Sequence, residues 1–374
     1  MLIAELNKKA LDVLNNTFGY SSYRYEQEKI INSVLLGNHT LAIMPTGAGK
    51  SLCYQIPAII SSKKTVVISP LISLMDDQVS ALKECGIQAA KIHSDMTYDE
   101  RSSSWNNFKN GKEKIIYLSP EKIMSEDFLN QLKNLDVGLF VIDEIHCVSK
   151  WGHNFRPDYN ELSQLKSLFP NSNIIGFTAT ADQTTRLDIL EKIFNKKVNV
   201  FISSLDRPNL SLSITQKTNW KSQLLEYLID RKSQSGIIYC LSKKKTEEVT
   251  SLLNDKGFNA STYHAGLDGQ VRKNVQDTFM TEQAHIVVAT IAFGMGIDKP
   301  DIRFVIHLNL PGSVEAYSQE IGRAGRDGNA SDTLLIYGLD DLVIRRRMIE
   351  ENSSEDKFKF HENKRLDYLL SYCE

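Results

Sequence analysis

The fold is decided by Thr40–Met44, the loop Pro45-Thr46-Gly47-Ala48-Gly49-Lys50-Ser51, and the segment Leu52–Ile60 that follows it. The first part is a short apolar run typical of a buried strand, and the last is an apolar segment that predicts a helix. Backbone N–H groups of such a glycine loop, with the N-terminus of the next helix, bind phosphate oxygens. The sequence therefore predicts a nucleotide-phosphate loop made of Thr46, Gly47, Ala48, Gly49, Lys50 and Ser51, although Met44 stands where the general pattern has glycine.

Two loop residues have predicted roles, which a carboxylate pair elsewhere in the chain completes. Lys50 would reach the β- and γ-phosphates, and the Ser51 hydroxyl would hold Mg²⁺. The apolar run Leu139–Ile142 ends in Asp143 and Glu144. A carboxylate at the end of a buried strand lies where such sheets bind ligands. We predict that Asp143 binds Mg²⁺ through water and that Glu144 orients and deprotonates the attacking water.

Two neighbouring motifs leave alternatives open. A lone histidine such as His146 is more often structural than catalytic. In Phe177-Thr178-Ala179-Thr180, the hydroxyls either bridge the ATP site to a lobe interface or cap the next helix.

Strand-like runs recur in two passes along the 374 residues, separated by amphipathic stretches. The runs of the first pass are Thr40–Met44, Thr65–Ser69, Ile115–Leu118, Leu139–Ile142 and Ile174–Phe177. Those of the second are Gly236–Tyr239, Ala260–Tyr263, Ile286–Ala289, Phe304–Leu308 and Thr333–Tyr337. Continuous apolar runs indicate parallel strands covered by helices on both faces. We predict an α/β fold with two doubly wound lobes, residues 1–205 and 206–340, joined by a polar linker at Ser203–Leu210, with a charged helical extension at 341–374.

Composition excludes several classes of protein. No apolar stretch approaches the ~20 residues of a membrane span, and the N-terminus lacks a signal-peptide pattern, so a cytoplasmic location is expected, with nucleoid association in a bacterium. The five cysteines include no CxxC pair, which argues against disulfides and against a complete zinc site. The net charge of −2 means that any surface for nucleic acid is local.

A second arginine-containing motif lies near the C-terminus, in Gln319–Gly328. Arg323 and Arg326 are three residues apart on one predicted helical turn, so they are expected to point the same way. Such a pair suits contact with a γ-phosphate across a cleft, where an arginine finger contributes ~10³–10⁵ in rate. The alternative is an exposed basic turn without a function.

The string Trp151-Gly152-His153-Asn154-Phe155-Arg156-Pro157-Asp158-Tyr159 predicts a contact with unpaired bases. Aromatic faces stack on bases at ~1–3 kcal/mol each. Placed just after the carboxylates, the loop could report nucleic-acid contact to the hydrolysis site. The alternative is that Trp151 and Phe155 are ordinary core aromatics.

With these motifs in order from about Phe18 to Tyr337, the chain resembles the RecQ family of superfamily 2 helicases. The resemblance implies two RecA-like lobes, ATP with Mg²⁺, and adenine recognition by Gln27 with Tyr20 and Arg24 near the base and ribose. Arg24-Tyr25-Glu26-Gln27 departs from the usual Arg-Pro-Gly-Gln. The resemblance also implies that five residues couple DNA binding to hydrolysis: His146, Trp151, His153, Phe155 and Arg156. It implies a catalytic role for Gln319, beside the two arginines.

Five further stretches resemble the family's strand-binding motifs: Ser69–Met75, Tyr117–Lys122, Tyr239–Lys244, Tyr263–Leu267 and Ala289–Pro300. Backbone N–H groups, hydroxyls and lysines suit phosphate contacts without reading bases. The lysine run 243–245 and the arginine run 345–347 are alternatively solvated faces. Family members commonly continue into a four-cysteine zinc subdomain and a winged helix, which we expect to be absent here.

The resemblance implies an ATP-dependent 3′→5′ DNA helicase in repair or recombination, acting as a monomer on single-stranded DNA and junctions. Two alternatives share the ATPase motifs, namely an RNA helicase and a duplex translocase. A third, a nucleic-acid-binding module without hydrolysis, is disfavoured by the presence of Lys50, Asp143, Glu144 and Arg326.

Overall fold

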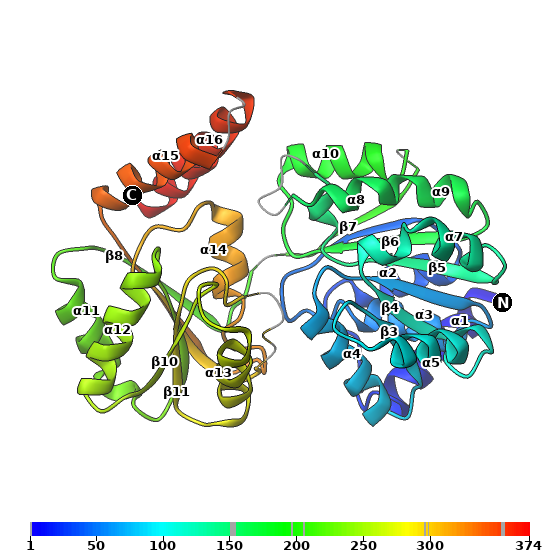
Figure 1. Cartoon of the computed structure of the whole chain (residues 1–374), viewed down its shortest axis with the longest axis horizontal. Coiled ribbons are helices and arrows are strands. Elements are labelled where there is room, and N and C mark those ends of the chain that lie inside the picture. The colour runs from blue at the N-terminus through cyan, green and yellow to red at the C-terminus, as the bar shows by residue number, and fades with distance from the viewer. Residues whose placement is uncertain are drawn as a thin grey trace. The chain divides into compact units, whose positions relative to one another are not determined.

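The computed structural model describes residues 2–149, 155–195, 197–204, 206–294, 297, 299–352 and 356–374. The chain divides into two compact units, Met1–Leu205 and Asp206–Glu374. Each unit is built around one parallel sheet (Figure 1). The predicted class, α/β with two doubly wound lobes in tandem, is confirmed.

The sheet of the first unit has, over the described residues, seven strands in the order β3-β4-β2-β5-β6-β1-β7, all parallel. In chain order they are β1 (Thr40–Ile43), β2 (Lys64–Ile68), β3 (Ala89–Ile92), β4 (Ile115–Leu118), β5 (Val137–Ile142), β6 (Asn173–Thr178) and β7 (Asn199–Ile202). The helices are α1 (Leu2–Asn16), α2 (Gln27–Leu35), α3 (Leu52–Ile60), α4 (Ile72–Glu84), α5 (Tyr98–Lys109), α6 (Pro120–Ile123), α7 (Glu126–Leu132), α8 (Pro157–Glu161), α9 (Leu165–Leu168) and α10 (Gln183–Lys192), with short 3₁₀ turns η1 (Ile145–Val148) and η2 (Leu162–Gln164).

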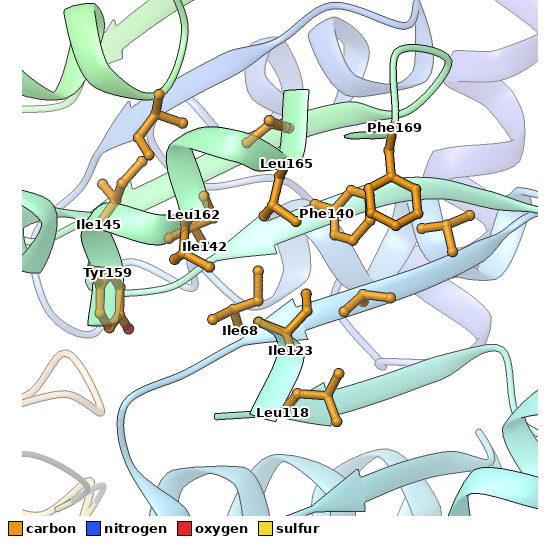
Figure 2. Close-up of a cluster of buried hydrophobic side chains, with 14 of the residues drawn as sticks. Ile68, Leu118, Ile123, Phe140, Ile142, Ile145, Tyr159, Leu162, Leu165 and Phe169 are labelled. Atoms are coloured by element: carbon orange, nitrogen blue, oxygen red, sulfur yellow. The ribbon is translucent and has the colours of Figure 1, made fainter. Parts of the chain in front are cut away.

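Two hydrophobic cores lie on opposite faces of this sheet. Successive side chains of a strand point to opposite faces. Accordingly, Phe140 and Ile142 of β5 join one core, shared with α5–α10, whereas Leu139 and Val141 join the other, shared with α1–α4. Figure 2 shows part of the first core, including Phe140 and Ile142. Both faces are therefore covered by helices, which explains why the central strands read as continuous apolar runs.

The second unit repeats this plan with six parallel strands over the described residues, in the order β10-β11-β9-β12-β13-β8. The strands are β8 (Leu210–Gln216), β9 (Ser235–Tyr239), β10 (Asn259–Tyr263), β11 (His285–Ala289), β12 (Ile302–His307) and β13 (Ser331–Tyr337). The helices are α11 (Trp220–Leu228), α12 (Lys243–Asp255), α13 (Gly269–Thr281), α14 (Val314–Ile321), α15 (Leu339–Asn352) and α16 (Asp356–Cys373), with the 3₁₀ turn η3 (Ile229–Arg231). Ile237 and Ile238 of β9 again face separate cores.

All ten predicted strand runs lie in strands, but three strands were not predicted: β3, β7 and β8. Each is at the edge of its sheet. β3 reads Ala-Ala-Lys-Ile and is largely buried, but its lysine interrupts the apolar run. β7 and β8 are poorly covered, so they need no continuous apolar run. β8 reads Leu-Ser-Leu-Ser-Ile-Thr-Gln and is mostly exposed, as is β7.

The charged C-terminal extension is helical, as predicted, and consists of α15 and α16. Leu366 and Leu369 of α16 are fully buried in a core of the second unit, so this helix packs as part of that unit. No helix within the described residues is long and apolar enough to cross a membrane.

Candidate nucleotide-binding and catalytic site

The topology of the first unit brings the phosphate loop and the carboxylates to the same end of its sheet, at the carboxyl ends of the strands. The loop follows β1, Asp143 follows β5, and β6 lies between these two strands. The backbone fixes this order, because Met44 N–H donates to the Thr178 carbonyl at 3.0 Å and Asp143 N–H donates to the Ile68 carbonyl at 2.9 Å. The predicted residues of the first half of the site are thus assembled by parallel strand ends.

The phosphate loop has a backbone that only small residues accept. Gly47 and Gly49 have φ of 79° and 75°, the left-handed region that favours glycine. A Cβ at Gly49 would also lie 2.4 Å from Nε2 of Gln27. Lys50 and Ser51 are half-buried, and α3 begins at Leu52, directly after Ser51. The loop therefore has the shape and the helix N-terminus that a phosphate group requires.

Gln27 is engaged with the phosphate loop itself. Its Nε2 donates to the carbonyls of Ala48 and Gly49 at 3.0 and 3.1 Å, and its Oε1 accepts from Arg24 N–H at 2.9 Å. The side chain is only 2% exposed. The residue expected to contact adenine is thus bound to the loop backbone in this structure, a contact that the sequence did not predict.

The segment before Gln27 has a different backbone from one with proline at position 25. Tyr25 has φ 51°, whereas proline is held near −65°. The departure from Arg-Pro-Gly-Gln noted in the sequence therefore changes the local chain path. Nearby, the guanidinium carbon of Arg24 lies 6.0 Å from the centroid of the Tyr20 ring, and both side chains are exposed. The structure thus brings together Tyr20 and Arg24, the predicted neighbours of the base and ribose.

The two carboxylates lie in a strained and charged turn. Glu144 has φ 48°, which costs a non-glycine residue ~1–3 kcal/mol and is commonest at functional sites. Its N–H donates to Asp143 Oδ1 at 3.0 Å. Burial, and then the charge of Glu144, raise the pKa of Asp143 to about 6, while Lys50 and His146 oppose this rise. A cation beside Asp143 would relieve the repulsion, so the donor set of Asp143 and Ser51 fits Mg²⁺, which usually keeps several waters.

His146 joins this turn to the next strand. Its Nδ1 lies 3.0 Å from Thr178 Oγ1 and 3.2 Å from Glu144 Oε2, and the residue is 1% exposed. Burial opposes protonation, but hydrogen bonds with Cys147 and Glu144 outweigh it and raise the pKa of His146 to about 10. Thr178 Oγ1 donates in turn to the Thr180 carbonyl at 2.8 Å. The helix-cap alternative for these threonines is wrong, because Asp182 caps α10.

Of the predicted DNA-coupling loop, Trp151 and His153 lie outside the described residues, whereas Phe155 and Arg156 lie within them. Phe155 is half-buried. Arg156 Nη1 donates to the Pro70 carbonyl at 3.1 Å, and its N–H donates to the Cys147 carbonyl at 3.0 Å. Arg156 thus connects the loop to Ser69–Met75, one of the predicted strand-binding motifs.

Tyr159 is a site residue for which the sequence predicted no role. Its hydroxyl donates to the backbone carbonyl of Asp143 at 3.0 Å, and its ring is fully buried. Figure 2 shows Tyr159 in the same hydrophobic cluster as Ile142 and Ile145, which flank the carboxylates in sequence. Ile145 in turn packs where Gly176 of β6 leaves room, since a Cβ there would lie 2.2 Å from Ile145 Cδ1. The hydrophobic core therefore packs against the Asp143–Glu144 turn and supports its backbone.

The arginines of the second unit are not on a helix, contrary to the prediction. α14 ends at Ile321, and Arg323 and Arg326 lie in the turns that follow. Gly322 and Gly325 within that stretch, the latter with φ 57°, favour the end of the helix. Gln319 lies on α14 and is half-buried.

Arg323 is held against the loop after β11. It is 5% exposed, and a Cβ at Gly294 would lie 3.0 Å from Arg323 Nη2. Burial raises the pKa of Tyr239 to about 12, against the opposing charge and hydrogen bond of Arg323. Arg323 Nε is buried without a hydrogen-bond partner among the described residues. This orphaned donor fits an anionic ligand.

Most of the predicted strand-binding motifs begin at the carboxyl ends of strands. Ser69–Met75 follows β2, Tyr117–Lys122 begins in β4, Tyr239–Lys244 in β9 and Tyr263–Leu267 in β10. The loop of Ala289–Pro300 follows β11, although Met295, Gly296 and Asp298 lie outside the described residues. Within each unit these loops therefore lie at the same end of the sheet, where the parallel strands end. Two hydroxyls serve as helix caps, since Ser119 caps α6 and Ser242 caps α12.

The arginine run 345–347 is not uniformly a solvated face. Arg345 Nε donates to the Leu310 carbonyl at 2.8 Å, and burial lowers the pKa of this guanidinium. Arg346 and Arg347 are exposed and pair with Asp367 and Glu351 at 3.3 and 3.0 Å.

Two tandem parallel α/β units with this phosphate loop, carboxylate turn and arginine turn define a superfamily 2 helicase core. The family model for DEAD/DEAH box helicases matches residues 24–188, and that for the helicase conserved C-terminal domain matches residues 220–328. Solved structures agree on the fold. Mss116p bound to single-stranded RNA and AMP-PNP has a TM-score of 0.70 at 19% identity, over 92% of this chain and 75% of that one. MrfA bound to DNA has a TM-score of 0.71 at 19% identity, over 94% and 54%.

Sequence relatives narrow the class to one family. The chain is 47% identical to the ATP-dependent DNA helicase RecQ of Pasteurella multocida, over 92% of this chain and 55% of the relative. It is 43% identical to that of Haemophilus influenzae, over 98% and 59%, and 40% identical to that of Bacillus subtilis, over 98% and 62%. The chain belongs to the RecQ family, as a helicase core. It spans between 55% and 62% of the length of these relatives.

Proposed function

We propose that this chain is an ATP-dependent DNA helicase motor that moves 3′→5′ along single-stranded DNA and separates duplexes in repair or recombination. The observation that carries the proposal is the Asp143–Glu144 turn. Lys50 of the phosphate loop partly offsets its negative charge, and Tyr159 from the aromatic segment donates a hydrogen bond to its backbone. The names of the relatives, ATP-dependent DNA helicases, support DNA as the substrate. The polarity is proposed from the family resemblance alone.

The first unit supplies one half of the ATP site. The loop Thr46–Ser51 holds the phosphates, with Lys50 on the β- and γ-phosphates and Ser51 and Asp143 holding Mg²⁺. Bound Mg²⁺ would neutralise phosphate charge during hydrolysis. Glu144 orients the attacking water and takes its proton. Tyr20 and Arg24 flank the base, and Gln27 contacts adenine once its amide leaves the loop backbone.

The second unit supplies the other half through Arg323 and Arg326, with Gln319 beside them on α14. The buried, orphaned Arg323 Nε supports a guanidinium reserved for an anion. An arginine contact with the γ-phosphate stabilises charge in the transition state and is worth ~10³–10⁵ in rate.

Contacts of the aromatic segment support the proposed coupling to DNA. Trp151, His153 and Phe155 would meet unpaired bases, and Arg156 and Tyr159 connect the same segment to Pro70 and to the Asp143 backbone. His146 extends this connection to Thr178. A protein of net charge −2 would hold DNA through local phosphate contacts at its strand-end loops.

The decisive experiment is ATP turnover with and without single-stranded DNA. We expect DNA to stimulate turnover and Lys50→Ala to remove the stimulated rate, because the lysine contacts the transferred phosphate. Turnover that persists in Lys50→Ala would show that the phosphate loop does not carry the activity. Turnover with no response to DNA would refute the motor. In Trp151→Ala, turnover without DNA should persist while stimulation is lost.

Polarity is tested on partial duplexes with a 3′ or a 5′ single-stranded tail. Preference for the 5′ tail would reverse the proposed direction. We further propose that the protein acts as a monomer at junctions of single-stranded and duplex DNA. Its work on chromosomal DNA would take place in the cytoplasm, at the nucleoid in a bacterium.

An RNA helicase is the second candidate, because Mss116p, a solved structure of similar fold, was bound to single-stranded RNA. Comparing the stimulation of ATP turnover by DNA and RNA of the same sequence separates the two. Greater stimulation by RNA would favour the second candidate.

A further inference from the structure

The turn that carries Arg323 and Arg326 is held by residues at the start of the second unit. The chain enters this unit at Asp206, and Arg207 follows directly. Arg207 Nη1 donates to the Gly322 carbonyl at 3.3 Å, and Nη2 donates to the carbonyls of Ala324 and Gly325, each at 2.9 Å. One guanidinium thus spans the stretch between the end of α14 and Arg326.

Asn209 adds further hydrogen bonds to the same turn. Arg207 Nε donates to Asn209 Oδ1 at 3.3 Å, which orients the amide. Asn209 Nδ2 then donates to the carbonyls of Gly325 and Asn329, each at 2.9 Å. The Gly322 carbonyl lies at the C-cap of α14, and the Ala324 and Gly325 carbonyls lie in the turns beyond it. Two side chains from residues more than a hundred positions earlier bind these carbonyls.

Gly325 lies in close contact with the side chains that bind the turn. It lies between Ala324 and Arg326, and its carbonyl accepts from both Arg207 and Asn209. A Cβ at this position would lie 2.5 Å from Asn209 Nδ2 and 2.8 Å from the Asn329 carbonyl. The glycine therefore lets the two side chains reach the backbone between the catalytic arginines. Arg323 and Arg326 leave this backbone on either side of the held carbonyls.

We propose that Arg207, assisted by Asn209, is a positioning residue for the arginine turn. It fixes the backbone from which Arg323 and Arg326 extend toward the γ-phosphate, and it does so from the segment that joins the two units. This inference rests on the proposed function of the two arginines. Only a guanidinium has the forked donors to bind three carbonyls at once, so lysine should not replace it.

The test compares four variants of the full chain by kcat and KM for ATP in the presence of single-stranded DNA. They are Arg207→Ala, Arg326→Ala, the pair Arg323→Ala with Arg326→Ala, and Arg207→Ala added to that pair. Displacement of a catalytic group by ~1 Å can cost about a hundredfold in rate. We therefore expect Arg207→Ala to lower kcat by between about tenfold and a hundredfold, with KM for ATP and DNA affinity nearly unchanged. In the background that lacks both arginines the same change should cost less than about twofold, because residues that act as a unit are not additive.

Arg231→Ala is the matched control. Arg231 also donates to a backbone carbonyl, that of Tyr227 at 2.7 Å, but it lies elsewhere in the second unit, paired with Asp332 at 2.8 Å. It should leave kcat unchanged. Should Arg207→Ala fail to fold, Arg207→Lys and Asn209→Ala take its place, with smaller losses of kcat expected in both.

The outcomes separate this inference from the proposed function. If Arg326→Ala lowers kcat while the Arg207 and Asn209 variants do not, the positioning role is refuted and the arginine finger stands. A full loss from Arg207→Ala in the background that lacks both arginines would also refute it, because the effect would then be independent of the arginines that the turn carries. If Arg323→Ala and Arg326→Ala both leave kcat unchanged, the proposed role of the arginines fails first.

Discussion

At the scale of single residues, the sequence assigned roles to chemical groups but did not anticipate their hydrogen-bond partners. Motifs marked Lys50, Asp143 and Glu144, because a strand followed by a loop and a helix restricts where phosphate-binding and catalytic groups can stand. Tyr159 and Arg207 were not given roles. Both act through backbone carbonyls, those of Asp143 and of Gly322, Ala324 and Gly325. A carbonyl is present at every position, so no residue pattern marks the one that will be bound.

Tyr159→Phe should separate support of the carboxylate turn from packing. The ring stays in its core, so the variant should fold and lose about 1 kcal/mol of unfolding free energy, typical of one hydrogen bond. The released Asp143 backbone should lower kcat several-fold. Urea unfolding and DNA-stimulated ATP turnover measure the two effects.

Tyr337→Phe is the control for that variant, since its hydroxyl also donates to a backbone carbonyl, that of Cys373 at 3.3 Å, in the second unit. It should lose comparable stability without loss of kcat. If Tyr159→Phe behaves in the same way, Tyr159 contributes packing alone.

At the scale of elements, prediction succeeded for the central strands and for the edge strand β10, and failed at the other edge strands, β3, β7 and β8. The central strands β5 and β9 alternate between two cores and read as apolar runs. The edge strands β7 and β8 are mostly exposed and carry polar residues. The helix predicted to carry Arg323 and Arg326 ends earlier, at Ile321, where the glycines at 322 and 325 favour its end. Arg207 and Asn209 bind carbonyls of the following turn.

Gly236→Ala should destabilise the second sheet. Gly236 lies on β9 beside Phe304 of β12, and a Cβ there would lie 2.0 Å from the Phe304 ring. Overpacking of this kind typically costs ~1–3 kcal/mol. The denaturant midpoint should fall accordingly, and Phe304→Leu added to Gly236→Ala should recover part of the loss.

Gly269→Ala is the comparison for that variant, because Gly269 begins α13 in open space. It should leave stability unchanged or raise it slightly, as alanine favours a helix. Equal losses in the two variants would mean that the Phe304 contact is not the cause.

At the scale of the whole molecule, the chain consists of two units that each have their own cores, and the proposed ATP site takes residues from both. Both cores of the first unit are made entirely of residues within Met1–Leu205. Sequence alone could predict this division, because the strand pattern repeats on either side of a polar segment. It could not predict that the segment's own Arg207 would bind the second unit's arginine turn.

A chain of residues 1–205 should therefore fold cooperatively and bind ATP, yet hydrolyse it without stimulation by DNA, because Arg323 and Arg326 are missing. Nucleotide titration and ATP turnover measure the two properties. The full chain with Arg323→Ala and Arg326→Ala should show the same pattern. Hydrolysis by residues 1–205 at the full-chain rate would contradict a divided site.

The hydrogen bonds of Gln27 bear on how tightly nucleotide is held. In this structure its amide is bound to the Ala48 and Gly49 carbonyls and to Arg24 N–H. The proposed contact with adenine would require these hydrogen bonds to break, so binding of the base would compete with the form in which Gln27 is bound to the loop. The observed dissociation constant would then be the intrinsic one divided by the fraction of molecules whose amide is released. Under this proposal, affinity for ATP would be set partly by a conformational equilibrium that exists before any nucleotide arrives.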